Sequence, residues 1–500
     1  MAAAMRPKRQ GQLSAAQRGK VLALMGVTFV ASAAISEVVK PGQFEYQRAA
    51  LAQPEGEEYK ETQALKTMQG TSFQALMPTL LGVREVLASL MWVQADDYFH
   101  RGEYRPIISM VKQITAIDPH QLDVYATGAW HMAYNFMDKR LIEDGVNFLQ
   151  AGCKNNSAVY DLFFEQGYMH YDKTKDFPAA VAAYELASQK KTTTGKVVPP
   201  SYVRHQLAHA IEKMGDIDRC VAQWEKNLEV GKELEKKEGV NPGAAGPNTA
   251  AAYHNLYITR RRLNERVASI AERERNQAEA VKLWEANVAL ADDWLKIFPN
   301  HGDVLKDRQR AQNEVERLKA GHLRPMSMAD LDMHFTVTRI APRKLEVEGT
   351  IDALDLSRVR VQFEDKDYPE RIKRGFDFKM DNCSLEWDDL PVNKNHFKRT
   401  IDLDKDPADM ERTPAEIYPL KADQYELSVT YNPRLQAAFI QDRYGWNGEG
   451  LTAKPGELVI DDSRAGMMNG KRYPLRLVRK VITLSREDVI GKEKKVLYKD

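Results

Sequence analysis

A pattern typical of a helical hairpin recurs five times between residues 88 and 298, and it constrains the fold more than any other feature of the chain. The first unit, counted from Ala88, places Ala95, Tyr98, Gly102, Tyr104 and Pro119 at positions 8, 11, 15, 17 and 32. A small residue at position 8 lets two antiparallel helices approach, an aromatic ring fills their seam, and a proline ends the second helix. The spacing therefore predicts a row of stacked helical pairs.

The later units keep this register with different residues. The third is the most regular, and its packing positions from Asp161 onward hold Phe164, Gly167, Tyr171, Phe177, Ala180, Tyr184 and Ala187. Further units begin at Ala126 and Ser201, and residues 280–287 of the fifth repeat the pattern of residues 220–227. An ordinary amphipathic bundle has no reason to repeat a period of about 35 to 40 residues. The region 88–298 resembles the tetratricopeptide-repeat family.

This resemblance implies a binding scaffold. Tetratricopeptide arrays generally grip an extended peptide or a helix of another protein on the concave surface made by their first helices. Five side chains lie one helical position away from the packed ones and are candidates for contacting such a partner: Asn135, Gln166, His170, Arg204 and His205.

Length and charge bound the remaining possibilities. A chain of 500 residues exceeds what one core normally organises, so we expect more than one structural unit. The 72 basic and 71 acidic side chains nearly cancel, which argues against nucleic acid as a partner. Cys153, Cys220 and Cys383 are too widely spaced for a zinc site, and we expect small buried side chains, with a disulfide or a reactive thiol as alternatives.

The amino terminus has the order of an export segment. Residues 1–20 form a basic tail, an uncharged stretch follows within 21–39, and residues 40–70 have the composition of a tether. We expect an uncleaved transmembrane anchor, with a cleaved signal ending near Ala33 or an ordinary buried helix as alternatives. The first two place the bulk of the chain outside the cytoplasm, in the periplasm or at the cell surface, and the anchor leaves the amino terminus cytoplasmic.

The hydrophobic period changes from helix to strand near residue 323. Residues 71–322 are predicted to form the helical repeat domain and residues 323–500 an immunoglobulin-like β-sandwich, giving an α+β multidomain chain. The strands are expected at 334–338, 344–348, 359–363, 425–431, 437–440, 458–460 and 475–481. In the glycine-rich loop that follows residue 440, Tyr444 and Trp446 either contact a partner or fold back onto the core.

Three groups of polar residues could carry chemistry, but none has a complete motif. His205, His209 and Glu212 share a helical face, yet Gln206 stands where a zinc hydrolase needs glutamate. The carboxylates of 364–367 and 386–389 lack the spacing of a calcium loop. We therefore predict no catalytic residue, no cofactor and no metal, and a chain that is not an enzyme.

Taken together, these features predict a non-enzymatic, membrane-anchored scaffold of the cell envelope that works within a multi-protein complex. It would bind other proteins through its helical groove and its β-sandwich. The main alternative is a permanent structural or assembly subunit of a large envelope machine, such as a pilus, a secretion system or a surface layer. An enzyme of carbohydrate or peptidoglycan turnover, using acidic pairs such as Glu386 and Asp389, is a third possibility.

Overall fold

The computed structural model describes residues 81–135, 140–238, 248–324, 328–366, 386–403, 420 and 422–500. The predicted basic tail, membrane segment 21–39 and tether 40–70 lie outside these residues. Within the described residues, no helix is both long and apolar enough to span a bilayer.

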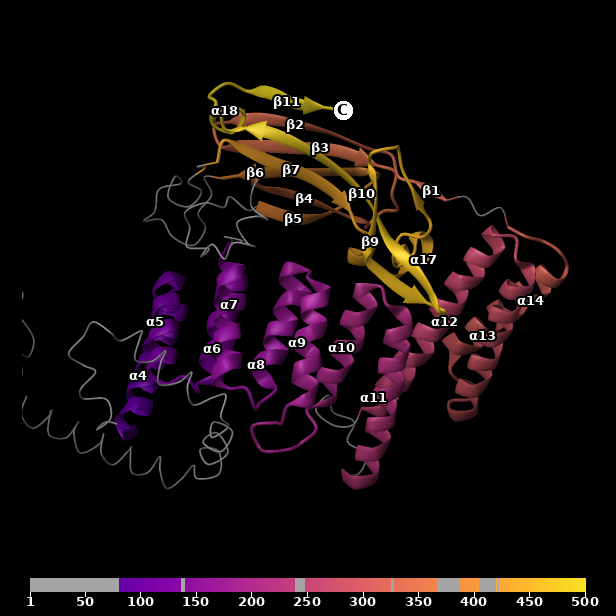
Figure 1. Ribbon diagram of the computed structural model, residues 1–500, viewed down its shortest axis with the longest axis horizontal. Helices are drawn as coiled ribbons and strands as arrows, with labels where there is room; N and C mark the ends of the chain where they lie inside the picture. Colours follow the sequence, from indigo (N-terminus) through magenta and orange to yellow (C-terminus); the bar gives the residue numbers. More distant parts are fainter. Residues whose placement is uncertain are drawn as a thin grey trace, which may run out of the picture.

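The helices stand side by side in one row, and consecutive helices pack against each other (Figure 1). In the described residues they form five pairs: α4 (Leu81–His100) with α5 (Tyr104–Ile117); α6 (Leu122–Trp130) and its π-helical turn η3 (His131–Asn135) with α7 (Arg140–Asn155); α8 (Asp161–Met169) and π-helical turn η4 (His170–Thr174) with α9 (Phe177–Gln189); α10 (Ser201–Met214) with α11 (Ile217–Glu238); and α12 (Thr249–Arg273) with α13 (Gln277–Ile297). A last helix, α14 (Gly302–Lys319), packs on α13.

The third pair shows why the repeated residues specify this packing. Tyr184 of α9 is fully buried, and its ring lies over Gly167 of α8, where an added Cβ would come within 2.7 Å of the ring. Glycine is therefore required for the two helices to approach. Asp176 then caps α9 by accepting a hydrogen bond from the backbone N–H of Ala179 at 3.1 Å.

The carboxyl-terminal region is rich in sheet. A five-stranded antiparallel sheet has the order β5-β4-β7-β10-β9, and a four-stranded one has the order β11-β2-β3-β6. The strands are β2 (Met333–Ala341), β3 (Lys344–Ile351), β4 (Arg358–Asp365), β5 (Glu386–Pro391), β6 (His396–Asp402), β7 (Gln424–Tyr431), β9 (Leu458–Met468), β10 (Lys471–Ser485) and β11 (Lys495–Lys499). The short strands β1 (Ala329–Asp330) and β8 (Leu451–Thr452) pair in parallel, and the short helix α18 (Arg486–Ile490) follows β10.

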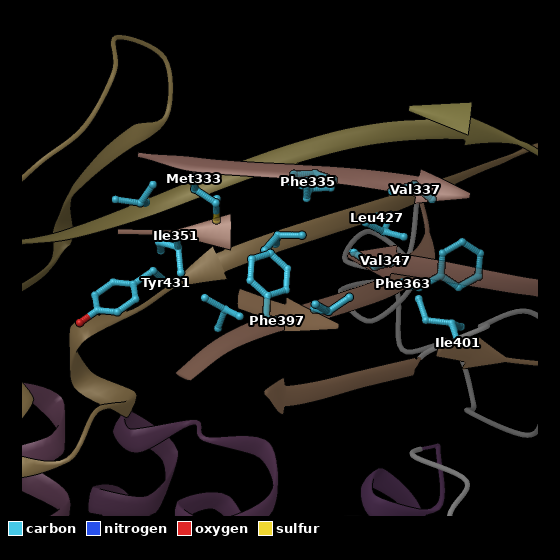
Figure 2. Close-up of a cluster of buried hydrophobic side chains, with 14 of the residues drawn as sticks. Met333, Phe335, Val337, Val347, Ile351, Phe363, Phe397, Ile401, Leu427 and Tyr431 are labelled. Atoms are coloured by element: carbon cyan, nitrogen blue, oxygen red, sulfur yellow. The ribbon is translucent and has the colours of Figure 1, made fainter. Parts of the chain in front are cut away.

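The two sheets share one hydrophobic core, because alternate side chains of their strands point toward each other (Figure 2). Phe335 of β2 and Phe397 of β6 come from one sheet, and Phe363 of β4 and Leu427 of β7 come from the other. Each of these side chains is at most 2% exposed. The period-two pattern therefore identified the buried face of β2, β4 and β7, whereas β6 was not among the expected strands.

One predicted strand is a helix. Residues 437–440 were expected in the sheet, but residues 433–435 form a 3₁₀ turn, η5 (Pro433–Leu435), and helix α17 (Ala438–Tyr444) follows. Pro433 cannot donate to a strand ladder, and the side chain of Asn432 caps the turn by accepting from the backbone of Arg434 at 3.0 Å. Of the two apolar residues at 439 and 440, only Ile440 lies on the buried face of this helix, and Phe439 is 52% exposed.

Candidate protein-binding surface

The sheet-rich region docks on the helical row at the end where the first helices turn into the second (Figure 1). The carbonyl oxygen of Gly215, at the end of α10, accepts a hydrogen bond from Asn447 Nδ2 at 3.0 Å. Gly215 has a φ of 81°, and a Cβ there would overlap the Asn447 side chain. At the start of α11, the carboxylate of Asp218 accepts from the backbone N–H groups of Asn469 and Gly470 at 2.7 and 2.8 Å.

Residues 432–450, here named the docking segment, make the central contacts of this interface. Trp446 is 2% exposed and packs with Ile217, Ile270 and Met468. The guanidinium of Arg262 lies 4.7 Å from the centre of its ring, which is cation–π geometry. Its indole nitrogen donates to the carboxylate of Glu212 at 3.3 Å. The indole thus fixes the docking segment to both α10 and α12.

Charged groups around the buried guanidinium of Arg262 complete the interface. Arg262 donates to Glu212 at 2.8 Å and to Asp442 at 2.9 Å. Burial alone would raise the pKa of Glu212, but the nearby His209 imidazole, 4.0 Å away, and the charge of Arg262 outweigh burial and lower that pKa to about 2. Glu212 is therefore ionised at neutral pH, and its buried charge is compensated.

A second pair of contacts lies further along α12. Arg266 donates to Glu449 at 3.4 Å, with both side chains less than a tenth exposed, and Arg273 donates to the backbone oxygen of Glu449 at 2.9 Å. The sequence pattern at 260–266 is typical of a solvated helical face. That expectation is wrong for Arg262 and Arg266, which face the docking segment. Their flanking apolar neighbours Leu263 and Val267 were the available signal that this face is covered.

The first helices of the other three pairs carry exposed rings near their carboxyl-terminal ends. Phe99, Trp130 and Tyr168 are 37, 44 and 39% exposed. Trp130 stacks on Tyr134 with ring centres 5.4 Å apart, and we name these four residues the aromatic surface. Contacts between successive helices hold it in place, because Phe99 lies against His131 of η3 with ring centres 5.1 Å apart.

The same surface is tied to the third pair. Tyr134 donates its hydroxyl proton to Asp172 at 2.7 Å, and the Lys173 ammonium lies 3.5 Å from the centre of the Tyr134 ring. Both partners belong to η4. The Tyr134 ring is therefore held by contacts with both Trp130 and Lys173, and Trp130 itself is 44% exposed.

The predicted groove residues do not form one surface. The side-chain amide nitrogen of Asn135 lies 2.6 Å from Nδ1 of His131. The ring of His205 packs on Trp224. Burial, together with the charges of Arg204 and His209, lowers the pKa of His205 to about 4. Arg204 is 4% exposed, so its assignment to a partner-binding face is wrong.

Gln166 and His170 are brought together in a cavity of about 530 Å³. It lies between the second helices α7 and α9, with α8 as its floor, and not on the row of first helices that the register indicated. Its walls are formed by Gln150, Cys153, Lys154, Ser157, Phe163, Gln166, His170, Ala179, Ala182, Ala183 and Leu186.

Tyr444 and Trp446 are both buried, but only Tyr444 folds back onto the core of the sheet-rich region. The hydroxyl of Tyr444 accepts a hydrogen bond from the backbone N–H of Leu354 at 2.9 Å, and its ring meets Tyr431 at 5.8 Å. Trp446 reaches out of the sheet-rich region to the helices.

The other candidate groups are engaged in ordinary interactions. His209 packs on Trp224, and Asp389 accepts from Arg360 at 2.8 and 3.0 Å. Within the described ranges no cluster of potential metal ligands is found. Cys153 and Cys220 are buried free thiols, which confirms the expectation for these two, and Cys383 lies outside the described residues.

Comparison with known proteins gives two structural likenesses. No protein-family model matches the chain, and no curated protein matches it. The crystal structure of the MamA protein matches with 13% identity over 47% of this chain and 96% of that one, at a TM-score of 0.26. The PilF structure from Pseudomonas aeruginosa matches with 16% identity over 46% of this chain and 99% of that one, at a TM-score of 0.23. The helical region is tetratricopeptide-like. The five helical pairs and their packing residues carry this assignment.

Proposed function

We propose that this chain is a non-enzymatic protein-binding scaffold whose aromatic surface captures a segment of another protein. The observation that carries the proposal is the division of the row of first helices. The docking segment covers α10 and α12, whereas α4, α6 with η3, and α8 keep exposed rings. Within the described residues, the row therefore binds a segment of its own chain at the fourth and fifth pairs and keeps exposed rings at the first three.

The open end has the composition of a contact site. Trp and Tyr supply large apolar area at low entropic cost, and they are enriched among the residues that dominate binding free energy. Three rings exposed by 37 to 44% on successive first helices exceed the isolated apolar side chains that any surface shows. Such an arrangement favours a partner segment that crosses several helices.

The proposal extends to the remainder of the chain. The basic-then-apolar order of residues 1–39 supports a membrane anchor with the folded regions in the periplasm or at the cell surface. Two antiparallel sheets around one core support an immunoglobulin-like sandwich for the carboxyl-terminal region. The scaffold would then be one member of a multi-protein envelope complex.

The test is crosslinking followed by mass spectrometry of the complex purified with the full chain. We expect crosslinks from the aromatic surface to one partner, and we expect Trp130→Ala with Tyr168→Ala to reduce recovery of that partner at least tenfold. Ile297→Ala, which removes a side chain 56% exposed on α13, is the matched control. Unchanged recovery with the double variant would refute the proposal.

A permanent structural subunit remains the competing function, and one observation favours it. Val459 and Ile460 on edge strand β9, with Val481 on β10, are 37, 52 and 44% exposed. A permanent interface would bury these residues and commonly more than about 2,000 Å² in total. The crosslinks separate the two functions, because a permanent subunit would be linked mainly through β9 and β10.

A further inference from the structure

We propose that the cavity between α7 and α9 is a second binding site, and that it takes an acidic amphipathic helix of a partner protein. This site is separate from the aromatic surface, since its sides are second helices. The argument rests on the shape of the cavity, on the apolar character of α9 and on the charge of the cavity walls.

Helix α9 is apolar on two faces. Its core face contains Ala180, Tyr184 and Ala187, all fully buried. A second stripe at helical spacing faces the cavity, and it consists of Ala179, Ala182, Ala183 and Leu186. Leu186 is 45% exposed. Within this stripe Ala183 is buried, whereas Ala182 and Leu186 are exposed, so the outer edge of this apolar face is open to a partner.

The shape of the cavity suits a helix. Two second helices flank the floor helix, and a volume of about 530 Å³ accommodates large apolar side chains in the groove between them. The small side chains of Ala179 and Ala182 allow a close backbone approach. An extended peptide would find no main-chain partners here, because the helices satisfy their own backbone groups, whereas a bound helix needs none.

Charge determines the kind of helix. The residues that form the cavity walls, all of them described, include Lys154 and contain no carboxylate. The Lys190 ammonium is also close, 5.2 Å from the centre of the Phe163 ring in the wall. Burial lowers the pKa of His170 and the nearby Asp176 opposes this effect, so the net direction is toward the neutral imidazole. Acidic residues beside an apolar stripe would therefore complement this rim.

The test uses the full chain and two fluorescein-labelled helical peptides that share leucines at i, i+3, i+4 and i+7. One peptide carries glutamate beside the leucines, and the other carries lysine at the same positions. Fluorescence anisotropy should show that the acidic peptide binds at least about tenfold more tightly. Ala182→Trp, which fills the groove, should weaken binding of the acidic peptide at least tenfold, and Lys154→Glu should reduce or reverse the preference between the peptides.

Val197→Ala, at a site 73% exposed and outside the cavity walls, is the control and should leave both affinities unchanged. A thermal melt of each variant verifies the fold. Equal binding of the two peptides, or full binding by a folded Ala182→Trp variant, would overturn the proposal. Displacement of the acidic peptide by decanoate alone would also overturn it, because the cavity would then be a site for small amphipathic acids.

Discussion

Removing the Trp446 indole should release the sheet-rich region from the helical row. The side chain is 2% exposed and packs with Ile217, Ile270 and Met468. The centre of its ring lies 4.7 Å from the guanidinium carbon of Arg262. Burial of a whole tryptophan contributes about 4 kcal/mol at 25 cal/mol per Å², and tryptophan-to-alanine changes in cores cost about 3 to 5 kcal/mol. We therefore expect Trp446→Ala to lower the local stability of the interface by about 4 kcal/mol.

Amide hydrogen exchange measured by mass spectrometry is the appropriate assay, because a chain with two regions need not unfold in one step. Since 1.4 kcal/mol corresponds to a factor of ten, about 4 kcal/mol corresponds to exchange roughly a thousandfold faster. The faster exchange should appear in residues 444–451, where the backbone N–H of Gly450 donates to the carbonyl oxygen of Tyr444 at 2.9 Å. The amides of β2 and β3, which lie in the four-stranded sheet, should stay protected from exchange.

Phe439→Ala is the matched control, because this ring belongs to the same docking segment but is 52% exposed. It should change exchange in 444–451 by less than tenfold. If Trp446→Ala accelerates exchange there by no more than its control does, the indole does not hold the interface and the reasoning is refuted.

Three further predictions concern single side chains. Glu212→Gln should destabilise the protein by about 3 kcal/mol above pH 4.5, because the pKa of the carboxyl is about 2 in the folded protein against an ordinary value of 4.5. The difference in urea-unfolding free energy between the original protein and the variant should narrow as the pH falls from 4.5 toward 2. A difference that stays constant over this range would contradict the assignment. Gly167→Ala should cost about 1 to 3 kcal/mol, since the new Cβ meets the Tyr184 ring, and an unchanged melting temperature would show that the ring can move aside. Arg204→Met should leave the free energy of unfolding in urea titrations unchanged or raise it by about 1 kcal/mol. The reason is that two buried guanidinium nitrogens of Arg204 have no hydrogen-bond partner within the described structure. A loss of more than about 2 kcal/mol would disprove the prediction.

The helical pairs and most strands could be predicted because their determinants are local. Gly167 and Tyr184 are 17 positions apart in one repeat, and the sequence alone placed both at packing positions. In the sheet-rich region, period-two alternation identified the buried faces of β2, β3, β4 and β7. The failure at 437–440 arose because a run of four residues is too short to distinguish a strand from a helix.

The binding faces were harder to predict, for two physical reasons. The π-helical turns η3 and η4 accommodate an extra residue per turn, so a register counted at 3.6 residues misplaces side chains such as Asn135 and His170. The interface also joins residues far apart in the chain. Arg261 pairs with Glu265 one turn away at 2.8 Å, as helical spacing predicts, but Arg262 pairs with Asp442, which no local pattern indicates.

The docking segment also has a mechanical consequence. In a stack of repeats each unit contacts only its neighbours, so the whole stack can bend through small rotations between successive units. Here Lys213 of α10 and Arg273 of α12 are both bonded to the docking segment, which braces the fourth and fifth pairs against each other. Curvature at that end is therefore fixed, and any elastic adjustment to a partner must occur in the first three pairs, where the aromatic surface lies.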